Sequence, residues 1–271
     1  MKMLPLLPLL LLLAPVFAQD PAAPAAPPAA PAPPAAPTDP VAKPEPGKPQ
    51  LLPNQEAFLN LPEEQRKEFI KNLGEANRLF QQKRIFETLN MLNKADAIFT
   101  DSPETLNIRG ACYVEFRAFD KAMAAFEAAL RLAPDNPSVL FNIGEVQFVT
   151  GEWQKAHDTL EKVFNSTPKE QVALSRLVEF KILLCKKKLG QNAEAKAMAE
   201  KYDIDDDSPF HCYAKAAIAY EEGNQILAEE WLARAGRIFQ NPEVLAPWQD
   251  TLVEYGYIKS FYGNDLGEGD E

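Results

Sequence analysis

Histidine, the residue that most often serves as metal ligand or catalytic base, is scarce in this chain. There are two, His157 and His211, and neither lies at helical spacing from a second type of metal ligand. The chain also lacks a glycine-rich phosphate loop, a serine in a nucleophile elbow and a His-Glu-x-x-His run. These absences leave catalysis without residues to perform it, so we expect no enzyme, no cofactor and no metal site.

Cysteine is scarce as well, and the three residues Cys112, Cys185 and Cys212 are an odd number. At least one thiol therefore has no partner within the chain. Cys185 falls late in one predicted helix and Cys212 early in the next, so we expect their Cα atoms to lie beyond the ~7 Å that a disulfide spans. Cys112 occupies an apolar helix position. We expect three structural cysteines and no disulfide.

A surplus of basic residues is absent too. Lysine and arginine number 28 against 39 aspartates and glutamates, and the net charge is −11. Nucleic-acid binding depends on neutralising phosphates with lysine and arginine, so we expect no nucleic-acid partner. Part of the acidity lies in residues 259–271, a glycine-containing tail that we expect to be disordered.

One acidic run, Asp203, Asp205 and Asp207, alternates like the first three ligands of a calcium-binding EF-hand loop. The sixth position holds Ser208 in place of the glycine that the sharp turn needs, and the twelfth holds Ala214 in place of a bidentate glutamate. We interpret the run as a polar turn in which Asp207 and Ser208 cap the next helix.

The first 18 residues have the composition of a secretory signal peptide. Lys2 precedes an apolar stretch, and Val16 and Ala18 are small residues at the −3 and −1 positions of a cleavage site. The stretch is shorter than the ~20 residues of a spanning helix, so the mature chain has no membrane span if the signal is cleaved. We expect an exported protein, periplasmic or extracellular. The alternative is an inner-membrane protein anchored by an uncleaved signal.

Residues 19–61 follow as a spacer, and from Asp20 to Pro53 they are almost entirely alanine, proline and a few charged residues. Such a composition cannot supply a core and favours polyproline II conformation. We expect a disordered Ala/Pro-rich spacer, whose role is either to hold the following domain at a distance or to serve as an inert leader.

A repeat begins after the spacer. A helix-capping residue is followed directly by proline at five places, and the intervals between these prolines are 34, 31, 41 and 33 residues. A side-chain oxygen of Ser, Thr or Asn accepts a hydrogen bond from the first turn, and proline fits the first helical position. Each pair therefore predicts a helix start. The five pairs are Ser102-Pro103, Asn136-Pro137, Thr167-Pro168, Ser208-Pro209 and Asn241-Pro242.

Residues 103–136 and 137–170 align without a gap. Small residues, an aromatic residue, an alanine, a bulky residue and a proline recur at the same offsets. Aligned pairs include Gly110 with Gly144, Phe119 with Trp153, Ala122 with Ala156, Phe126 with Leu160, Ala129 with Val163 and Pro134 with Pro168. This pattern resembles the tetratricopeptide repeat, in which small residues let two antiparallel helices approach closely.

Weaker copies extend the resemblance over residues 62–258. Diverged units are predicted at 69–102, 171–207 and 209–240, and residues 242–258 form a helix that covers the end of the stack. The resemblance implies an all-α, right-handed helical-repeat solenoid, TPR-like, of about five helix pairs plus a C-terminal capping helix.

Solenoids of this family usually bind an extended peptide or a partner helix in the concave groove of their first helices. The resemblance implies a non-enzymatic scaffold or adaptor of the cell envelope or secreted space, with a protein or peptide partner. The alternative is a periplasmic holdase-like chaperone or assembly factor for envelope proteins, and self-association is a further possibility. Carried over by position, the groove residues are Asn77, Phe80, Asn107, Glu115, Phe141, Glu145 and Phe148, with the two last-named phenylalanines expected as exposed anchors.

Overall fold

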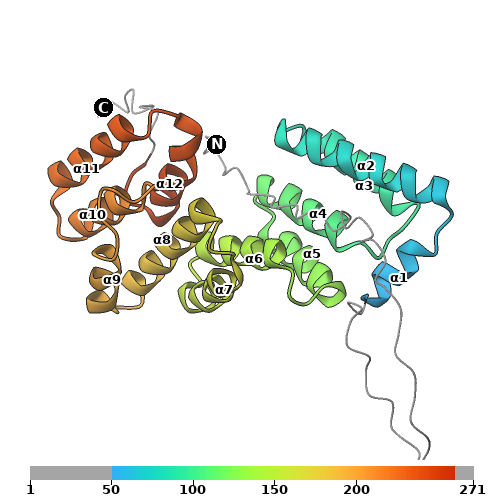
Figure 1. Cartoon of the computed structure of the whole chain (residues 1–271), viewed down its shortest axis with the longest axis horizontal. Helices are drawn as coiled ribbons and strands as arrows, with labels where there is room; N and C mark the ends of the chain where they lie inside the picture. The colour runs from blue at the N-terminus through green and yellow to red at the C-terminus, as the bar shows by residue number, and fades with distance from the viewer. Residues whose placement is uncertain (1–50, 260–271) are drawn as a thin grey trace, which may run out of the picture.

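The computed structural model describes residues 51–259, which form α-helices joined by short turns. The helices follow an arc from α1 at one end to α12 at the other (Figure 1). No helix among the described residues is long and apolar enough to cross a membrane. The helices are α1 (Pro53–Leu59), α2 (Glu63–Gln81), α3 (Ile85–Asp96), α4 (Pro103–Glu115), α5 (Phe119–Leu132), α6 (Pro137–Val149), α7 (Trp153–Ser166), α8 (Val172–Lys188), α9 (Asn192–Ala199), α10 (Phe210–Glu221), α11 (Gln225–Ile238) and α12 (Pro242–Tyr255).

Helices α2 to α11 form five antiparallel pairs, and α12 covers the end of the stack. Each pair consists of consecutive helices, α2 with α3 through α10 with α11, and successive pairs stack on one another. The prediction of a helical-repeat solenoid of about five pairs plus a cap is therefore confirmed.

Three of the five capping pairs start helices as predicted. The side chains of Ser102, Asn136 and Asn241 each accept a backbone N–H of the first turn, and proline follows in the first helical position. Ser208 accepts from the N–H of Phe210 at 3.3 Å, and α10 begins there. Thr167-Pro168 does not start a helix, since a turn that ends at residue 171 intervenes and α8 begins at Val172.

Two glycines explain why the paired helices can lie so close together. A Cβ atom added at Gly110 would lie 2.4 Å from the Phe126 ring, and one added at Gly144 would lie 2.8 Å from Leu160. Real Cβ atoms do not approach other carbons to these distances. The small-residue positions of the repeat are thus the places where the bulky residue of the second helix meets the backbone of the first.

The turn inside each helix pair contains one residue in the left-handed backbone region. Glycine supplies it at positions 151, 190 and 223, but Lys83 and Arg117 supply it in the first two pairs, with φ of 59° and 55°. Glycine adopts this conformation without the steric cost that a Cβ atom imposes. The first two turns therefore carry a local strain that the later three do not.

The spacer was predicted to continue to residue 61, and this boundary is wrong. Residues 53–59 form helix α1, and its Phe58 packs edge-on against Phe69 and Phe99. One aromatic residue in a polar and proline-containing segment gives a weak sequence signal, and its partners lie in α2 and after α3. The predicted signal peptide, the rest of the spacer and residues 260–271 of the predicted tail lie outside the described residues.

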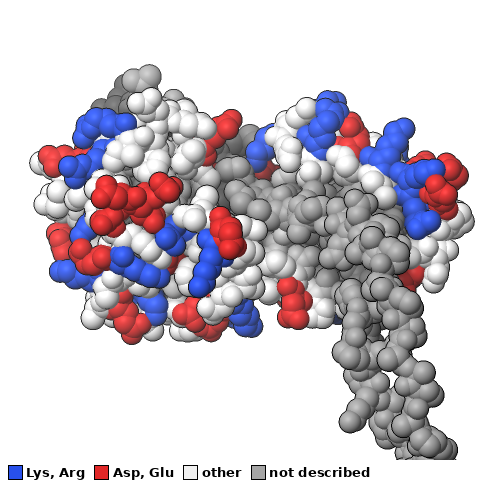
Figure 2. All heavy atoms as spheres, viewed as in Figure 1, with Lys and Arg blue, Asp and Glu red and all other residues white. Residues whose placement is uncertain are grey.

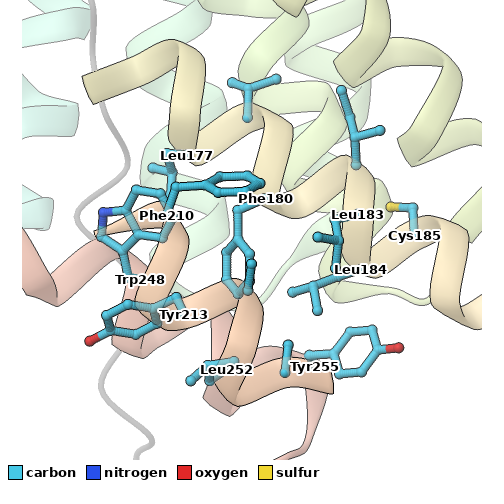
Figure 3. Packing of buried hydrophobic residues seen from close by; sticks show 14 of the residues in the cluster. Leu177, Phe180, Leu183, Leu184, Cys185, Phe210, Tyr213, Trp248, Leu252 and Tyr255 are labelled. Atoms are coloured by element: carbon cyan, nitrogen blue, oxygen red, sulfur yellow. The ribbon is translucent and has the colours of Figure 1, made fainter. Parts of the chain in front are cut away.

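The largest hydrophobic core lies toward the C-terminal end and is shared by five helices (Figure 3). Trp248, Leu252 and Tyr255 of α12 point into it from one side, facing Phe180 of α8. The Phe180 and Trp248 rings are 5.3 Å apart between centroids. At ~25 cal/mol per Å² of buried apolar area, a buried tryptophan and tyrosine make α12 an integral part of the fold.

Candidate partner-binding groove

The first helices of the pairs form what we call the inner face, the side of α2, α4, α6 and α8 on which the predicted groove residues lie. Neighbouring first helices contact each other from α2 to α4, from α4 to α6 and from α8 to α10. At its C-terminal end this face meets α12, because α12 packs on α8. The inner face therefore has one part walled by α12 and another formed by α2, α4 and α6.

The expectation that Phe141 and Phe148 are exposed anchors is wrong. Their exposed fractions are 2% and 0%, and both belong to the C-terminal core. Phe148 packs against Trp153 and Tyr255, with ring centroids 5.3 and 6.3 Å away. The repeat pattern gives the position of a residue on a helix but not what a distant helix, here α12, places over it.

The remaining predicted residues divide between α2, α4 and α6. Phe80 is buried in the core of the first two pairs, and Asn77 is half-buried. Glu115 forms a 2.7 Å ion pair with Lys83 of the α2–α3 turn, so it links two neighbouring units. Asn107 and Glu145 are buried polar residues, and their partners define the chemistry of the inner face.

Asn107 and Asn142 join α4 to α6 through a buried hydrogen bond. The Asn142 Nδ2 atom donates to the Asn107 Oδ1 atom at 2.8 Å. This bond fixes the Asn142 amide, and its Oδ1 atom is buried with no hydrogen-bond partner. The Oδ1 atom of Asn77 is in the same condition. Buried acceptors without partners are rare because each one costs ~1–3 kcal/mol of lost hydration.

A buried lysine organises the part of the inner face beside α12. Lys181 of α8 has no exposed surface, and its Nζ atom lies 3.1 Å from Glu145 on α6 and 3.3 Å from Glu254 on α12. The same ammonium group lies 4.7 Å from the centroid of the Phe148 ring. One cation therefore ties together α6, α8 and α12.

The carboxylates around this lysine outnumber it. Burial raises the pKa of Glu254 to about 8 even though Lys181 opposes the shift, and burial raises the pKa of Glu145 as well. Burial lowers the pKa of Lys181, but the two glutamates outweigh it, so the net direction is upward. Burial likewise raises the pKa of Asp250. The cluster thus keeps its lysine charged and holds a proton on a carboxyl group near neutral pH.

Sequence reasoning missed Lys181 and Glu254. A signal was present, because Lys181 interrupts the otherwise apolar run from Phe180 to Cys185. A lysine inside such a run is rarely buried unless it is paired. Its acidic partners are 36 and 73 residues away in the chain, and neither has a spacing relationship to it that a repeat pattern would reveal.

The residues considered for metal binding have ordinary structural partners. His211 contacts the backbone oxygen of Tyr202 at 2.7 Å, and His157 lies beside two carboxylates of its own helix. In the acidic run, Asp206 pairs with Arg176 at 3.0 Å, and the Asp203 side chain accepts the N–H of Asp205. No cluster of three or more metal-ligating side chains occurs among residues 51–259.

The cysteines lie in the helix interiors. Cys112, Cys185 and Cys212 are all buried and unpaired. Burial raises the pKa of each thiol, to about 12 for Cys112 and Cys185. They pack as small apolar residues.

Charged residues on the face shown in Figure 2 alternate in sign over the C-terminal helices, with no continuous basic surface among the coloured atoms. That distribution agrees with the acidic composition of the whole chain. A phosphate backbone would find no positive stripe on this face.

Comparison with known proteins gives a matching family model and a distant curated relative. The model, described as tetratricopeptide repeat, matches residues 113–177. Protein CTR9 homolog of Arabidopsis thaliana is 28% identical over 109 residues, which cover 39% of this chain and 10% of that protein. The aligned region of this chain thus spans about a tenth of the curated relative's length.

Two solved structures share the helical architecture. The structure of pilF from Pseudomonas aeruginosa has a TM-score of 0.52 at 16% identity, over 71% of this chain and 97% of that one. The structure of YrrB, described as a TPR protein with an unusual peptide-binding site, has a TM-score of 0.46 at 21% identity, over 71% and 95% of the two chains.

Proposed function

Because this chain is a tetratricopeptide repeat protein, we propose that it is a non-enzymatic interaction scaffold that holds a partner through its inner face. Proteins of this family and fold typically act as interaction modules. The proposed binding site is the part of the inner face formed by α2, α4 and α6. The partner enters as an extended peptide or a helix, and the protein itself supplies no catalytic group.

The observation that supports this site most directly is the unpartnered Oδ1 atom of Asn142. Its amide is fixed by Asn107 at 2.8 Å, so the acceptor has a defined direction. An extended peptide offers backbone N–H donors, and a hydrogen bond from one of them would remove the cost of the buried acceptor. Asn77 offers a second acceptor of the same kind on α2.

Helix α12 limits where a partner can bind. Its Tyr255 packs near Phe148, and its Glu254 pairs with Lys181, so this part of the inner face is already covered by the chain itself. We therefore place the partner toward α2 and α4. A double substitution of Phe141 and Phe148 would empty the core and cannot serve as a probe of the groove.

The experiment uses a photo-reactive amino acid at Asn77 on the inner face and, as a control, at Phe86, which is 73% exposed on the second helix of the same pair. We expect a discrete adduct with one stoichiometric partner in the host's envelope fraction from position 77 and none from position 86. Asn142→Ala should weaken the adduct, whereas Asn165→Ala, an exposed asparagine on α7, should not.

Two outcomes would change the proposal. Equal adducts from positions 77 and 86 would remove the inner face as the site. Many unfolded clients, together with suppression of their aggregation, would favour the holdase alternative over an adaptor.

Location is part of the same proposal. An exported protein, periplasmic or secreted, follows from the signal-like residues 1–18. Intact-mass measurement of the protein from its host distinguishes a chain that begins after Ala18 from one that keeps the segment as an inner-membrane anchor.

A further inference from the structure

An apolar hollow lies at the N-terminal end, away from the inner-face cluster. Its volume is about 270 Å³, and its lining includes Leu52, Phe58, Phe69, Phe99 and Pro103. The three phenylalanine rings pack edge-on around one another, with centroids 5.1 to 6.0 Å apart. The hollow therefore has an aromatic wall built by α1, α2 and the segment after α3.

Large apolar side chains surround this hollow and are open to solvent. Ile70, which lines it, is 51% exposed, and Leu51 and Leu59 at the two ends of α1 are 41% and 42% exposed. A contiguous apolar surface of this kind marks a site where another chain segment packs.

Two amide side chains give the hollow hydrogen-bond donors. The Oε1 atom of Gln55 accepts from the N–H of Leu52, and the Oδ1 atom of Asn136 accepts from the N–H groups of residues 138 and 139. Their oxygens are thus used in capping, which leaves the NH₂ groups as donors, and these have no acceptor within the described part of the chain. Both residues line the hollow.

We propose that the Ala/Pro-rich segment, residues 19–50 of the same chain, docks into this hollow. A proline-rich chain in polyproline II conformation presents carbonyl acceptors and few N–H donors, and it binds aromatic-lined grooves. Aromatic rings with free amide donors are the complement of such a chain. The proposal is independent of the partner site on the inner face.

The chain connectivity favours this occupant over others. Residue 50 joins the described fold at Leu51, and the next residue, Leu52, already lines the hollow. Gly47 allows the chain to reverse direction. A tethered segment reaches an effective concentration on the order of millimolar, so weak docking is enough to fill the site. Lys43 and Lys48 also complement Glu104 of the hollow in charge.

The test compares the chain from residue 19, which keeps every described residue, with a variant whose residues 19–50 are replaced by a Gly/Ser sequence of equal length. The readout is the NMR methyl signal of Ile70, with Ile226, 74% exposed on α11, as the control. We expect the Ile70 signal to differ between the two proteins and the Ile226 signal to coincide. A synthetic peptide of residues 19–50 added to the Gly/Ser variant should move the Ile70 signal toward its wild-type position, and should bind the wild-type chain at least tenfold more weakly.

Three results would overturn the proposal. Identical Ile70 signals in the two proteins would leave the hollow to a foreign partner. An Ile70 signal in the wild type that changes with protein concentration would assign the hollow to a second copy. Equal peptide affinity for both proteins would show that the tethered segment does not fill the site.

Discussion

Replacing Glu254 by glutamine tests the buried cluster that fastens α12 to the solenoid. Burial raises the pKa of Glu254 from its ordinary 4.5 to about 8 in the folded protein. Between these values the folded state holds a proton that the unfolded state has lost, so the free energy of unfolding falls as the pH rises. Below about pH 4.5 this carboxyl contributes no pH dependence, and above about pH 8 its penalty is complete.

The magnitude follows from the pKa difference. A tenfold change in proton affinity corresponds to ~1.4 kcal/mol, so the stability should fall by ~1.4 kcal/mol per pH unit across this window. The full loss would be about 5 kcal/mol if Glu254 alone carried the proton. Glu145 and Asp250 face the same lysine and share the titration, so the loss is distributed over the cluster.

Urea denaturation of wild type and Glu254→Gln at pH values from 5 to 9 measures this dependence. We expect the variant to be close to wild type at pH 5 and more stable by several kcal/mol at pH 9, because its amide cannot ionise. Glu243→Gln, an exposed change on the same helix, should follow the wild-type curve. Parallel curves for wild type and Glu254→Gln over the whole range would refute a buried carboxyl that keeps its proton at neutral pH.

Three further changes probe the repeat itself. Gly110→Ala should destabilise by ~1–3 kcal/mol, because its Cβ would meet the Phe126 ring at 2.4 Å, whereas Gly74→Ala, with open space around it, should stabilise α2 by up to ~1 kcal/mol; thermal unfolding reports both, and an equal effect would contradict the close-approach argument. Arg117→Gly should raise the free energy of unfolding by up to ~1 kcal/mol, because the residue has a φ of 55°; a loss in chemical denaturation would show that its side chain outweighs the backbone strain. Phe148→Ala should cost ~3–5 kcal/mol and broaden the NMR signals of the core, and a native-like melting temperature would mean that the ring is not buried.

The local features of this fold could be predicted from sequence because their causes are local. Ser102, Asn136 and Asn241 cap helices through hydrogen bonds to residues two or three positions away, and proline fixes the next backbone angle. The contact of Gly110 with Phe126 lies inside one helix pair. A 34-residue period records both, so five pairs and a capping helix follow from the chain itself.

The binding residues could be predicted only in part. The first helices were identified correctly, and Asn107 and Glu145 both take part in polar contacts between elements. Phe141 and Phe148 were misjudged because an apolar residue on a first helix can face either a partner or a distant part of the same chain. Whether such a residue is exposed depends on how far the solenoid curves and on what its end covers.

What the sequence alone determined is therefore the repeat, its helix starts and its helix pairs, all of which depend on residues close together in the chain. Only the tertiary structure decided that α12 folds onto α8, because the pairing of Lys181 with Glu254 spans 73 residues. The same is true of α1, whose Phe58 finds its aromatic partners in other elements. Burial and pKa arise from this long-range packing, since the solvent that each side chain loses depends on every element placed around it.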